Sequence, residues 1–223
     1  MEQEFLISLF MIIGIDLILG GDNAIVIALA CRNLAEQQRQ KAILLGTFLA
    51  ITVRIVLTSF AVILLKIPFL QLIGGLFLLF IAYHLIVGKD EKNDNIQSHQ
   101  SLWKAVKTIV IADILMGLDN VVAIAGAANG KTTLVIIGLL ISVPIIIWGS
   151  RFILKLLEHF PGLVYVGGGM LAFTAGKMIN QEHNLQPFLL YHPHLALSIP
   201  YVMTVFIIAG GLVYNHFIQN RPN

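Results

Sequence analysis

The chain has 223 residues, of which 57% are hydrophobic and 12% are charged, and its formal net charge is +2. Soluble domains carry about 25% charged residues, so this chain lacks the polar surface of a soluble enzyme or a nucleic-acid-binding module. Its one cysteine, Cys31, excludes an intramolecular disulfide and a CxxC redox pair.

Several apolar stretches are about 20 residues long, enough to cross a hydrocarbon core of about 30 Å. In chain order we expect seven transmembrane helices, over Phe5–Cys31, Lys41–Leu65, Pro68–Val87, Leu102–Asn129, Thr132–Leu156, Pro161–Ile179 and His194–Phe217. The acidic start, MEQEF, lacks the basic region of a cleavable signal, so the first span is expected to stay in the mature protein. The predicted fold is a single all-α membrane domain over residues 1–223.

The first span carries two carboxylates, Asp16 and Asp22, and the amide of Asn23. A charge at mid-bilayer costs about 2.5–3.5 kcal/mol on insertion scales, so these groups are expected to face the protein interior. Gly20 and Gly21 lie between the carboxylates, and glycine relaxes the restrictions on the backbone. A broken helix there would turn Asp22 inward and free backbone carbonyls as ligands.

The second and third spans add two weaker signals. Arg54 lies in the middle of the second span and is a candidate partner for an Asp carboxylate. The Gly74-Gly75 pair of the third span favours close contact between helices. Residues 88–101, GKDEKNDNIQSHQS, are polar and are expected to form a cytoplasmic linker after a first three-helix repeat over residues 5–87.

The fourth span repeats the motif of the first. Asp113, Gly117, Asp119 and Asn120 each follow Asp16, Gly20, Asp22 and Asn23 by 97 residues, although Leu118 replaces Gly21. Seven residues of the third span, Gly74 and Gly75 among them, recur 93 positions later in the sixth, where Gly167, Gly168 and Gly169 form a second glycine cluster. Gly46 pairs more weakly with Gly138. These matches indicate a second three-helix repeat over residues 102–180.

Three spans per half is an odd number, so the two repeats should be inverted across the membrane, as in many transporters. Residues 194–217 would then form an extra transmembrane helix outside the symmetry. Ten Lys and Arg residues lie on one predicted side and two or three on the other. This asymmetry predicts an N-terminus outside and a C-terminus in the cytoplasm.

Together the two motifs offer up to four carboxylates and two amide oxygens. Such oxygen-only coordination suits divalent cations such as Mn²⁺, Mg²⁺ and Ca²⁺. The predicted metal ligands are Asp16, Asp22, Asn23, Asp113, Asp119 and Asn120. A structural role, with the carboxylates bonded to hydroxyls, amides or Arg54, is the alternative, and protons could share the site. No cofactor is expected.

The phrases GGDNAIVIALA and GLDNVVAIAGAA, on the first and fourth of seven spans, resemble the TerC family of integral membrane proteins. The short length resembles its YjbE-type branch. The resemblance covers nearly the whole chain and implies a bacterial inner-membrane protein of metal homeostasis, chiefly a manganese exporter. It also implies an ion site at the six residues named above, where this sequence shows no departure.

The expected function is export of a divalent metal ion, with Mn²⁺ preferred, by alternating access and with possible proton counter-transport. An inert membrane scaffold that recruits a partner is one alternative. An intramembrane aspartyl protease is another, but its GxGD phrase is absent: Leu19 stands two residues before Gly21, and the second copy reads Gly117-Leu118-Asp119. The chain is therefore expected not to be an enzyme.

Overall fold

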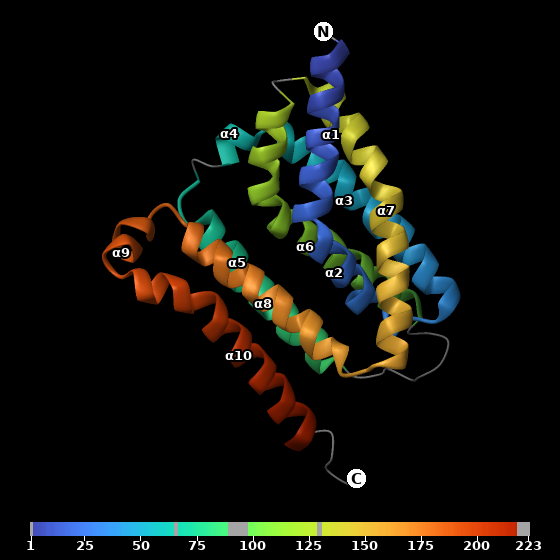
Figure 1. Cartoon of the computed structure of the whole chain (residues 1–223). Helices are drawn as coiled ribbons and strands as arrows, with labels where there is room; N and C mark the ends of the chain where they lie inside the picture. Colours follow the sequence, from blue (N-terminus) through green and yellow to red (C-terminus); the bar gives the residue numbers. More distant parts are fainter. Residues whose placement is uncertain (1, 65–66, 89–97, 129–130, 218–223) are drawn as a thin grey trace. The chain divides into compact units, whose positions relative to one another are not determined.

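The computed structural model describes residues 2–64, 67–88, 98–128 and 131–217, and within these ranges the chain is all-helical, with no β-strand (Figure 1). Contacts group the chain into two compact units, one of residues 1–67 with 93–156 and one of residues 68–92 with 157–223. Each unit takes helices from both predicted repeats, so unit boundaries and repeat boundaries do not coincide.

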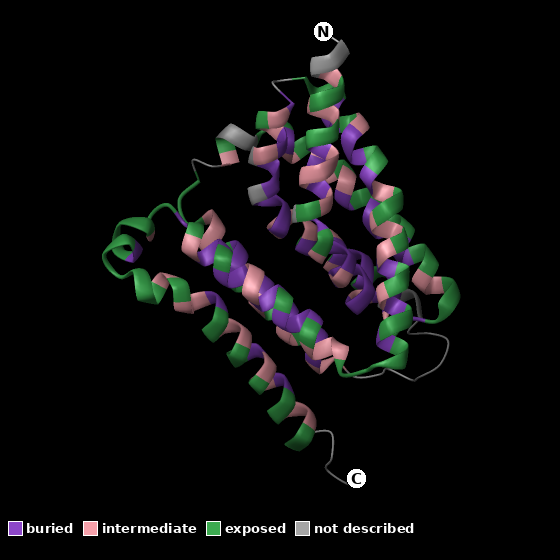
Figure 2. Ribbon diagram, viewed as in Figure 1, coloured by how far each residue is buried: buried purple, intermediate pink, exposed green. Residues whose placement is uncertain are grey.

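The first unit contains the first two helical segments of each repeat. Its elements are α1 (Glu2–Leu19), α2 (Gly21–Cys31), α3 (Glu36–Ser59), the short α4 (Ala61–Leu64), α6 (Ser98–Ala127) and most of α7 (Thr132–His159). One apolar cluster of this unit joins α1, α6 and α7 through Ile12, Ile124, Leu134 and Leu139. Figure 2 shows α2 as a largely buried segment, and seven of its eleven residues are buried.

The first predicted span is broken at Gly20, as the glycine pair predicted. The described parts of α1 and α2 meet at 44°. The Gly20 N–H donates to the Asp16 carbonyl at 2.8 Å, and a Cβ at Gly20 would collide with that same oxygen. Only glycine therefore fits this junction, which separates Asp16 at the end of α1 from Asp22 and Asn23 at the start of α2.

The second motif has no equivalent break at Gly117, because α6 runs without interruption from Ser98 to Ala127. A single glycine inside a helix costs about 1 kcal/mol, which the packing of a long helix easily offsets.

The second predicted span ends earlier than expected. Thr58 and Ser59 bond back to the carbonyls of Arg54 and Ile55, and such hydroxyl bonds bend helices. Helix α3 accordingly ends at Ser59 rather than continuing to residue 65.

The second unit contains the third helix of each repeat, α5 (Leu70–Val87) and α8 (Leu163–Gln181), with α9 (Gln186–Tyr191) and α10 (Pro193–Phe217). The short α9 is absent from the sequence-based expectation. The predicted extra helix corresponds to α10, which packs on α8: a Cβ at Gly176 would come 2.5 Å from Cα of Pro200. Most of the predicted linker, residues 89–97, lies outside the described residues, and residues 98–101 already belong to α6.

Glycine contacts repeat between the two halves of the sequence. Gly46 of α3 lies against Ile109 of α6, and its counterpart Gly138 of α7 lies against Ile12 of α1, where Ile12 precedes Ile109 by 97 residues. In the second unit Gly75 lies against Ile179, and Gly168 lies against Ile86. In both units, therefore, a glycine from one half of the sequence contacts an isoleucine from the other half, and the two corresponding residues make the same contact in reverse. The prediction that the glycine clusters bring helices close together is confirmed at Gly75 and Gly168.

Among the described residues, four helices are long and apolar enough to cross a membrane, namely α3, α5, α7 and α10, and the bent pair α1–α2 would add a fifth. Over the described residues α6 and α8 do not join this set, so the count of seven spans stays a prediction. Large apolar side chains point outward on these helices, for example Phe48 at 68%, Trp148 at 73% and Phe206 at 71% exposed. Such surfaces suit lipid rather than water, and the chain is a multi-pass membrane protein.

Candidate functional site

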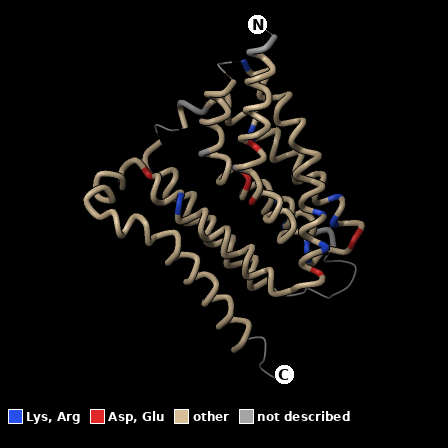
Figure 3. Tube along the Cα trace, viewed as in Figure 1, with Lys and Arg blue, Asp and Glu red and all other residues tan. Residues whose placement is uncertain are grey.

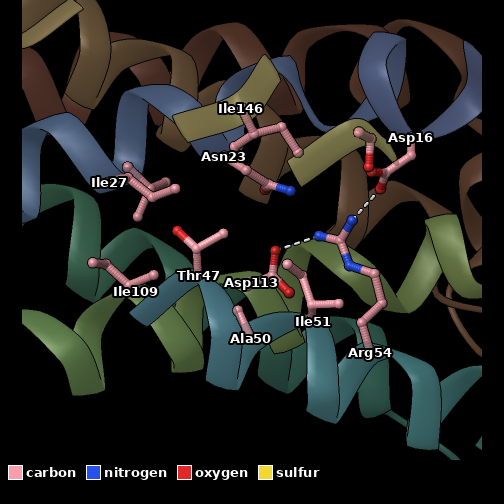
Figure 4. Close-up of a pocket in the computed structure, with 12 residues that line it drawn as sticks. Asp16, Asn23, Ile27, Thr47, Ala50, Ile51, Arg54, Ile109, Asp113 and Ile146 are labelled. Carbon is pink, nitrogen blue, oxygen red and sulfur yellow. Dashed lines mark hydrogen bonds and ion pairs between the residues drawn. The ribbon is translucent and has the colours of Figure 1, made fainter. Parts of the chain in front are cut away.

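Arg54 joins the two repeat-related aspartates. Its guanidinium, carried by α3, donates through Nη1 to Asp16 at the end of α1 and through Nη2 to Asp113 in α6 (Figure 4). Arg54 is 3% exposed and Asp16 is 1% exposed. Removing one partner from a buried pair costs about 3–5 kcal/mol, so this bridge ties three helices of the first unit together.

Ser142 completes the environment of Asp16. Its hydroxyl, on α7, lies in hydrogen-bonding contact with Oδ2 of Asp16 and also with the carbonyl of Leu139, 2.9 Å away. The two carboxylate oxygens of Asp16 thus have separate partners, Arg54 on one and Ser142 on the other. All four helices α1, α3, α6 and α7 contribute a side chain to this buried polar cluster, which we call the Arg54 cluster: Asp16, Arg54, Asp113 and Ser142.

A small cavity of about 20 Å³ adjoins the Arg54 cluster. Space of that size accommodates one water-sized species. Its polar lining comes from the four members of the cluster together with Asn23 of α2 and Thr47 of α3. The remaining walls are apolar and are formed by Val26, Ile27, Ala50, Ile51, Ile109 and Ile146.

Three polar groups at this cavity have no hydrogen-bond partner within the part of the chain that the structure describes. They are the side-chain amide of Asn23, with both its oxygen and its nitrogen, the hydroxyl of Thr47, and Nε of Arg54. Asn23 and Thr47 are each 4% exposed, and Figure 4 shows them on opposite sides of the space beside Asp113. Because an unsatisfied buried polar group costs about 1–3 kcal/mol, this cavity favours a polar or charged occupant.

The other predicted ligands lie elsewhere. Asp22 is half-buried in the first turn of α2, and Asn120 is buried in α6, but neither lines the cavity. Asp119 also belongs to α6, and its side chain lies outside the described residues. Of the six predicted ligands, the structure therefore brings together Asp16, Asn23 and Asp113.

No group of three or more His, Cys, Asp or Glu side chains suited to a metal ion occurs among the described residues. The cavity instead combines two carboxylates with an amide and a hydroxyl, a set of hard oxygen donors. With Arg54 in place, the two carboxylates and one guanidinium sum to one net negative charge. The oxygen donors can bind a small cation. In the structure the cationic guanidinium of Arg54 already bonds to both carboxylates.

Sequence reasoning identified Asp16, Asp113 and the candidate partner Arg54, but it missed Thr47 and Ser142. The only available signal for the two hydroxyl residues was a polar side chain inside an apolar span. That signal is weak, because a helical hydroxyl commonly bonds to a backbone carbonyl of its own helix, as Thr52 does to Phe48 at 2.8 Å.

Basic residues of the first unit gather at the end where α3 and α6 begin and α7 ends (Figure 3). Arg32, Arg39 and Lys41 flank the start of α3, and Arg151 and Lys155 lie in the last turns of α7. This clustering is the pattern that the positive-inside rule associates with a cytoplasmic surface.

Comparison with known proteins identifies relatives over the full length of the chain. The model of the family described as "Integral membrane protein TerC family" matches residues 1–223. The chain is 52% identical to the uncharacterized membrane protein YjbE of Bacillus subtilis, over 96% of this chain and 98% of that protein. It is 23% identical to YceF of the same organism, over 92% of this chain and 79% of the relative.

A larger relative matches over part of its length. The inner membrane protein YoaE of Escherichia coli, described as a UPF0053 protein, is 27% identical over 74% of this chain and 35% of its own length. No solved structure matches the chain.

Proposed function

Because this chain belongs to the TerC family of integral membrane proteins, we propose that it is a divalent metal-ion transporter whose preferred cargo is Mn²⁺. The cargo leaves the cytoplasm, and the protein serves metal homeostasis rather than catalysis. The proposed ion pathway passes through the cavity beside the Arg54 cluster, and the six residues of the paired motifs, Asp16, Asp22, Asn23, Asp113, Asp119 and Asn120, remain the proposed ion ligands.

One observation carries the proposal: Asp16 and Asp113, 97 residues apart in sequence, meet at one buried cavity with Asn23. Buried carboxylates inside membrane helices are costly and mark ion pathways. Their convergence from equivalent positions of two repeats is the arrangement expected when each repeat supplies half of a site.

The exchange of glycine contacts supports the two-repeat architecture. Gly46 with Ile109 and Gly138 with Ile12 are the same contact made from either half. Reciprocal contacts of this kind are the mark of a two-fold relation between two similar parts. We propose that the halves are inverted in the membrane and that alternating access exposes the site to one side at a time.

Exporting a dication against an inside-negative potential costs about 4.6 kcal/mol per 100 mV, twice the value of about 2.3 kcal/mol for a single charge. Protons moving inward through the same carboxylates would offset this cost, so we propose proton counter-transport.

A transporter also accounts for the Arg54 cluster better than an aspartyl protease does. Two protease aspartates share a proton with each other, whereas Asp16 and Asp113 are each paired with Arg54.

The experiment that tests the function is ion uptake into proteoliposomes containing the purified full chain. Mn²⁺, Ca²⁺, Mg²⁺ and Zn²⁺ are offered separately to the natural protein and to the Asp16→Asn and Asp113→Asn variants. We expect Mn²⁺ flux in the natural protein and its loss in both variants. Glu36→Gln is the matched control, because Glu36 is an exposed acid in the first turn of α3.

Flux of Mn²⁺ that persists in both aspartate variants would remove the cavity from the ion path. If no divalent ion moves through correctly folded protein, the scaffold alternative takes the place of the transporter. Coupling is tested separately, by collapsing the proton gradient at a fixed membrane potential, which should reduce Mn²⁺ flux.

The proposed location is the bacterial cytoplasmic membrane, with the N-terminus outside and the C-terminus inside. The basic end of the first unit supports a cytoplasmic position for the start of α3 (Figure 3). A reporter that fluoresces only in the cytoplasm, fused after residue 223, should be bright, and a dark, correctly inserted fusion would reverse the assignment.

A further inference from the structure

Arg54 has no counterpart in the second repeat. At the offset of 92 residues that relates Gly46 to Gly138, its position corresponds to Ile146, which lines the same cavity as an apolar side chain. The aspartates are therefore duplicated, whereas the cation between them is not. One guanidinium satisfies two carboxylates that the repeats supply in equivalent positions.

The cavity holds more oxygen ligands than Arg54 uses. The amide oxygen of Asn23 and the hydroxyl of Thr47 are buried at its wall with no hydrogen-bond partner among the described residues. An arginine is a donor and a positive charge, so it can use acceptor oxygens of this kind. Among the described residues, its terminal nitrogens nevertheless bond only to the two aspartates. The unused oxygens indicate a second cationic occupant.

We propose that Arg54 is a resident cation that competes with the transported divalent ion for Asp16 and Asp113. In one state Arg54 holds both carboxylates through the contacts seen in the structure. When the divalent ion enters, it binds Asp16, Asp113, Asn23 and Thr47, and Arg54 leaves the carboxylates. This inference rests on the proposed function and adds two residues, Arg54 and Thr47, to the ion site.

Electrostatics makes the two occupants exclusive. A dication placed between the carboxylates would lie within a few ångströms of the guanidinium, and like charges repel strongly in a buried, low-dielectric site. Without Arg54, the two carboxylates match the charge of a dication. With Arg54 in place only one net negative charge remains, which disfavours the dication. Return of Arg54 would then help to expel the ion after it has crossed.

The first test measures Mn²⁺ affinity of the purified full chain in detergent, by isothermal titration, for the natural protein and for Arg54→Gln and Arg54→Lys. Arg54→Gln should bind Mn²⁺ at least about tenfold more tightly, because a competing unit charge has been removed from a low-dielectric site. Arg54→Lys should lie between the two, since a compact ammonium lacks the planar fork that reaches both carboxylates. Arg151→Gln, at an exposed position of α7, is the control.

The second test supplies the missing cation from solution. Guanidinium ion added to Arg54→Ala at a concentration well below that needed for unfolding should raise the melting temperature and weaken Mn²⁺ binding competitively. The natural protein should show neither effect. This measurement keeps the inference testable even if Arg54→Gln folds poorly, because guanidinium itself restores the buried charge.

The third test concerns Thr47. Thr47→Val removes the hydroxyl at nearly constant volume and should weaken Mn²⁺ binding several-fold. Thr52→Val is the matched control, because Thr52 on the same helix is exposed and its hydroxyl bonds to the Phe48 carbonyl. Equal Mn²⁺ affinity in both variants would remove Thr47 from the site.

The outcomes separate the two proposals. Suppose that the natural protein transports Mn²⁺, that Arg54→Gln binds it no more tightly, and that guanidinium does not compete in Arg54→Ala. Arg54 then has a purely structural role, and the competition is refuted. The proposed transport function is unaffected by that result. If neither the natural protein nor Arg54→Gln binds Mn²⁺, Ca²⁺ or Mg²⁺, the transport function and the competition both fall.

Discussion

Gly138 of α7 leaves the space that Ile12 of α1 fills: a Cβ on the glycine would come 2.5 Å from Cγ2 of the isoleucine. Gly46 leaves the equivalent space for Ile109, whose Cδ1 would lie 2.8 Å from an added Cβ. Ile109 also lines the cavity beside Arg54, and Ile12 lies four residues before Asp16 on α1. Close packing at the two glycines therefore sets the spacing of the helices that carry the aspartates.

Gly138→Ala should destabilise the first unit by about 1–3 kcal/mol, because overpacking a tight helix contact forces side chains and backbone to shift. Gly14→Ala is the control, since nothing lies within 4 Å of a Cβ added there. Thermal unfolding of the purified protein, followed by tryptophan fluorescence, measures both variants. Equal melting temperatures for the two would contradict the packing account.

Ser142→Ala should lower the stability by about 1–3 kcal/mol, because it leaves Oδ2 of the buried Asp16 without that hydrogen bond. Ser150→Ala offers a close comparison on the same helix. Ser150 is also buried, but its hydroxyl bonds to a backbone carbonyl of its own helix, that of Ile147, at 2.8 Å. Its replacement should change the denaturation midpoint much less, and a comparable loss in both variants would show that Ser142 has no special role toward Asp16.

Asp16→Asn should have opposite effects in two backgrounds. In the natural protein it removes one of the two carboxylates that hold Arg54, and stability should fall. In Arg54→Gln it removes one of two unpaired negative charges, and stability should rise. A double-mutant cycle from chemical denaturation should give a coupling of about 1–3 kcal/mol between the two positions. A coupling near zero would mean that the contact contributes little.

Glu182, in the connection after α8, predicts a pH-dependent contribution to stability. Burial raises the pKa of its carboxyl, but the bonds donated by the backbone N–H groups of Asn184, Phe69 and Leu72 and by the Asn184 side chain outweigh this and lower the pKa overall. A depressed folded-state pKa stabilises the protein above the ordinary glutamate value of about 4.3. That contribution is lost as the pH falls through the folded-state pKa.

Glu182→Gln should therefore destabilise the protein by about 1.5–3 kcal/mol at pH 7, the range for hydrogen bonds to a charged group. The difference in melting temperature between variant and natural protein should shrink as the pH is lowered below about 4. Glu36→Gln, at an exposed position of α3, is the control. If the difference in melting temperature between Glu182→Gln and the natural protein stayed constant with pH, the charge of the Glu182 carboxylate would not be the cause of the stabilisation.

The bend at Gly20 and the pairing of the two aspartate motifs could be predicted from the sequence, because both follow from residue type alone. The glycine pair at Gly20 and the repeated aspartates are visible in one line of sequence, and the bend and the convergence of Asp16 with Asp113 follow from them. The uninterrupted α6 shows the limit of this reasoning. Gly117 has the same chemistry as Gly20, but in α6 Leu118 follows it, and the helix passes through.

Residues whose role depends on a neighbouring helix were harder to predict. Thr47 and Ser142 differ in no local way from Thr52 and Ser150, and only their contacts in three dimensions distinguish them. Arg54 was conspicuous as a charge in an apolar span, yet its simultaneous contact with both repeats could not be deduced from its position. The pairing of Glu182 with Phe69, 113 residues away, had no signal in the sequence.

That last pairing has a consequence for biosynthesis. Phe69 precedes α5 in a left-handed conformation, with φ of 61°, and its N–H and that of Leu72 depend on Glu182. A ribosome adds about 5–20 residues per second. Phe69 and Glu182 are 113 residues apart, so the start of α5 emerges roughly 6 to 23 seconds before the carboxylate that caps it. During that interval α5 must be held by the insertion machinery or by lipid alone, and only the arrival of the end of α8 fixes its first turn.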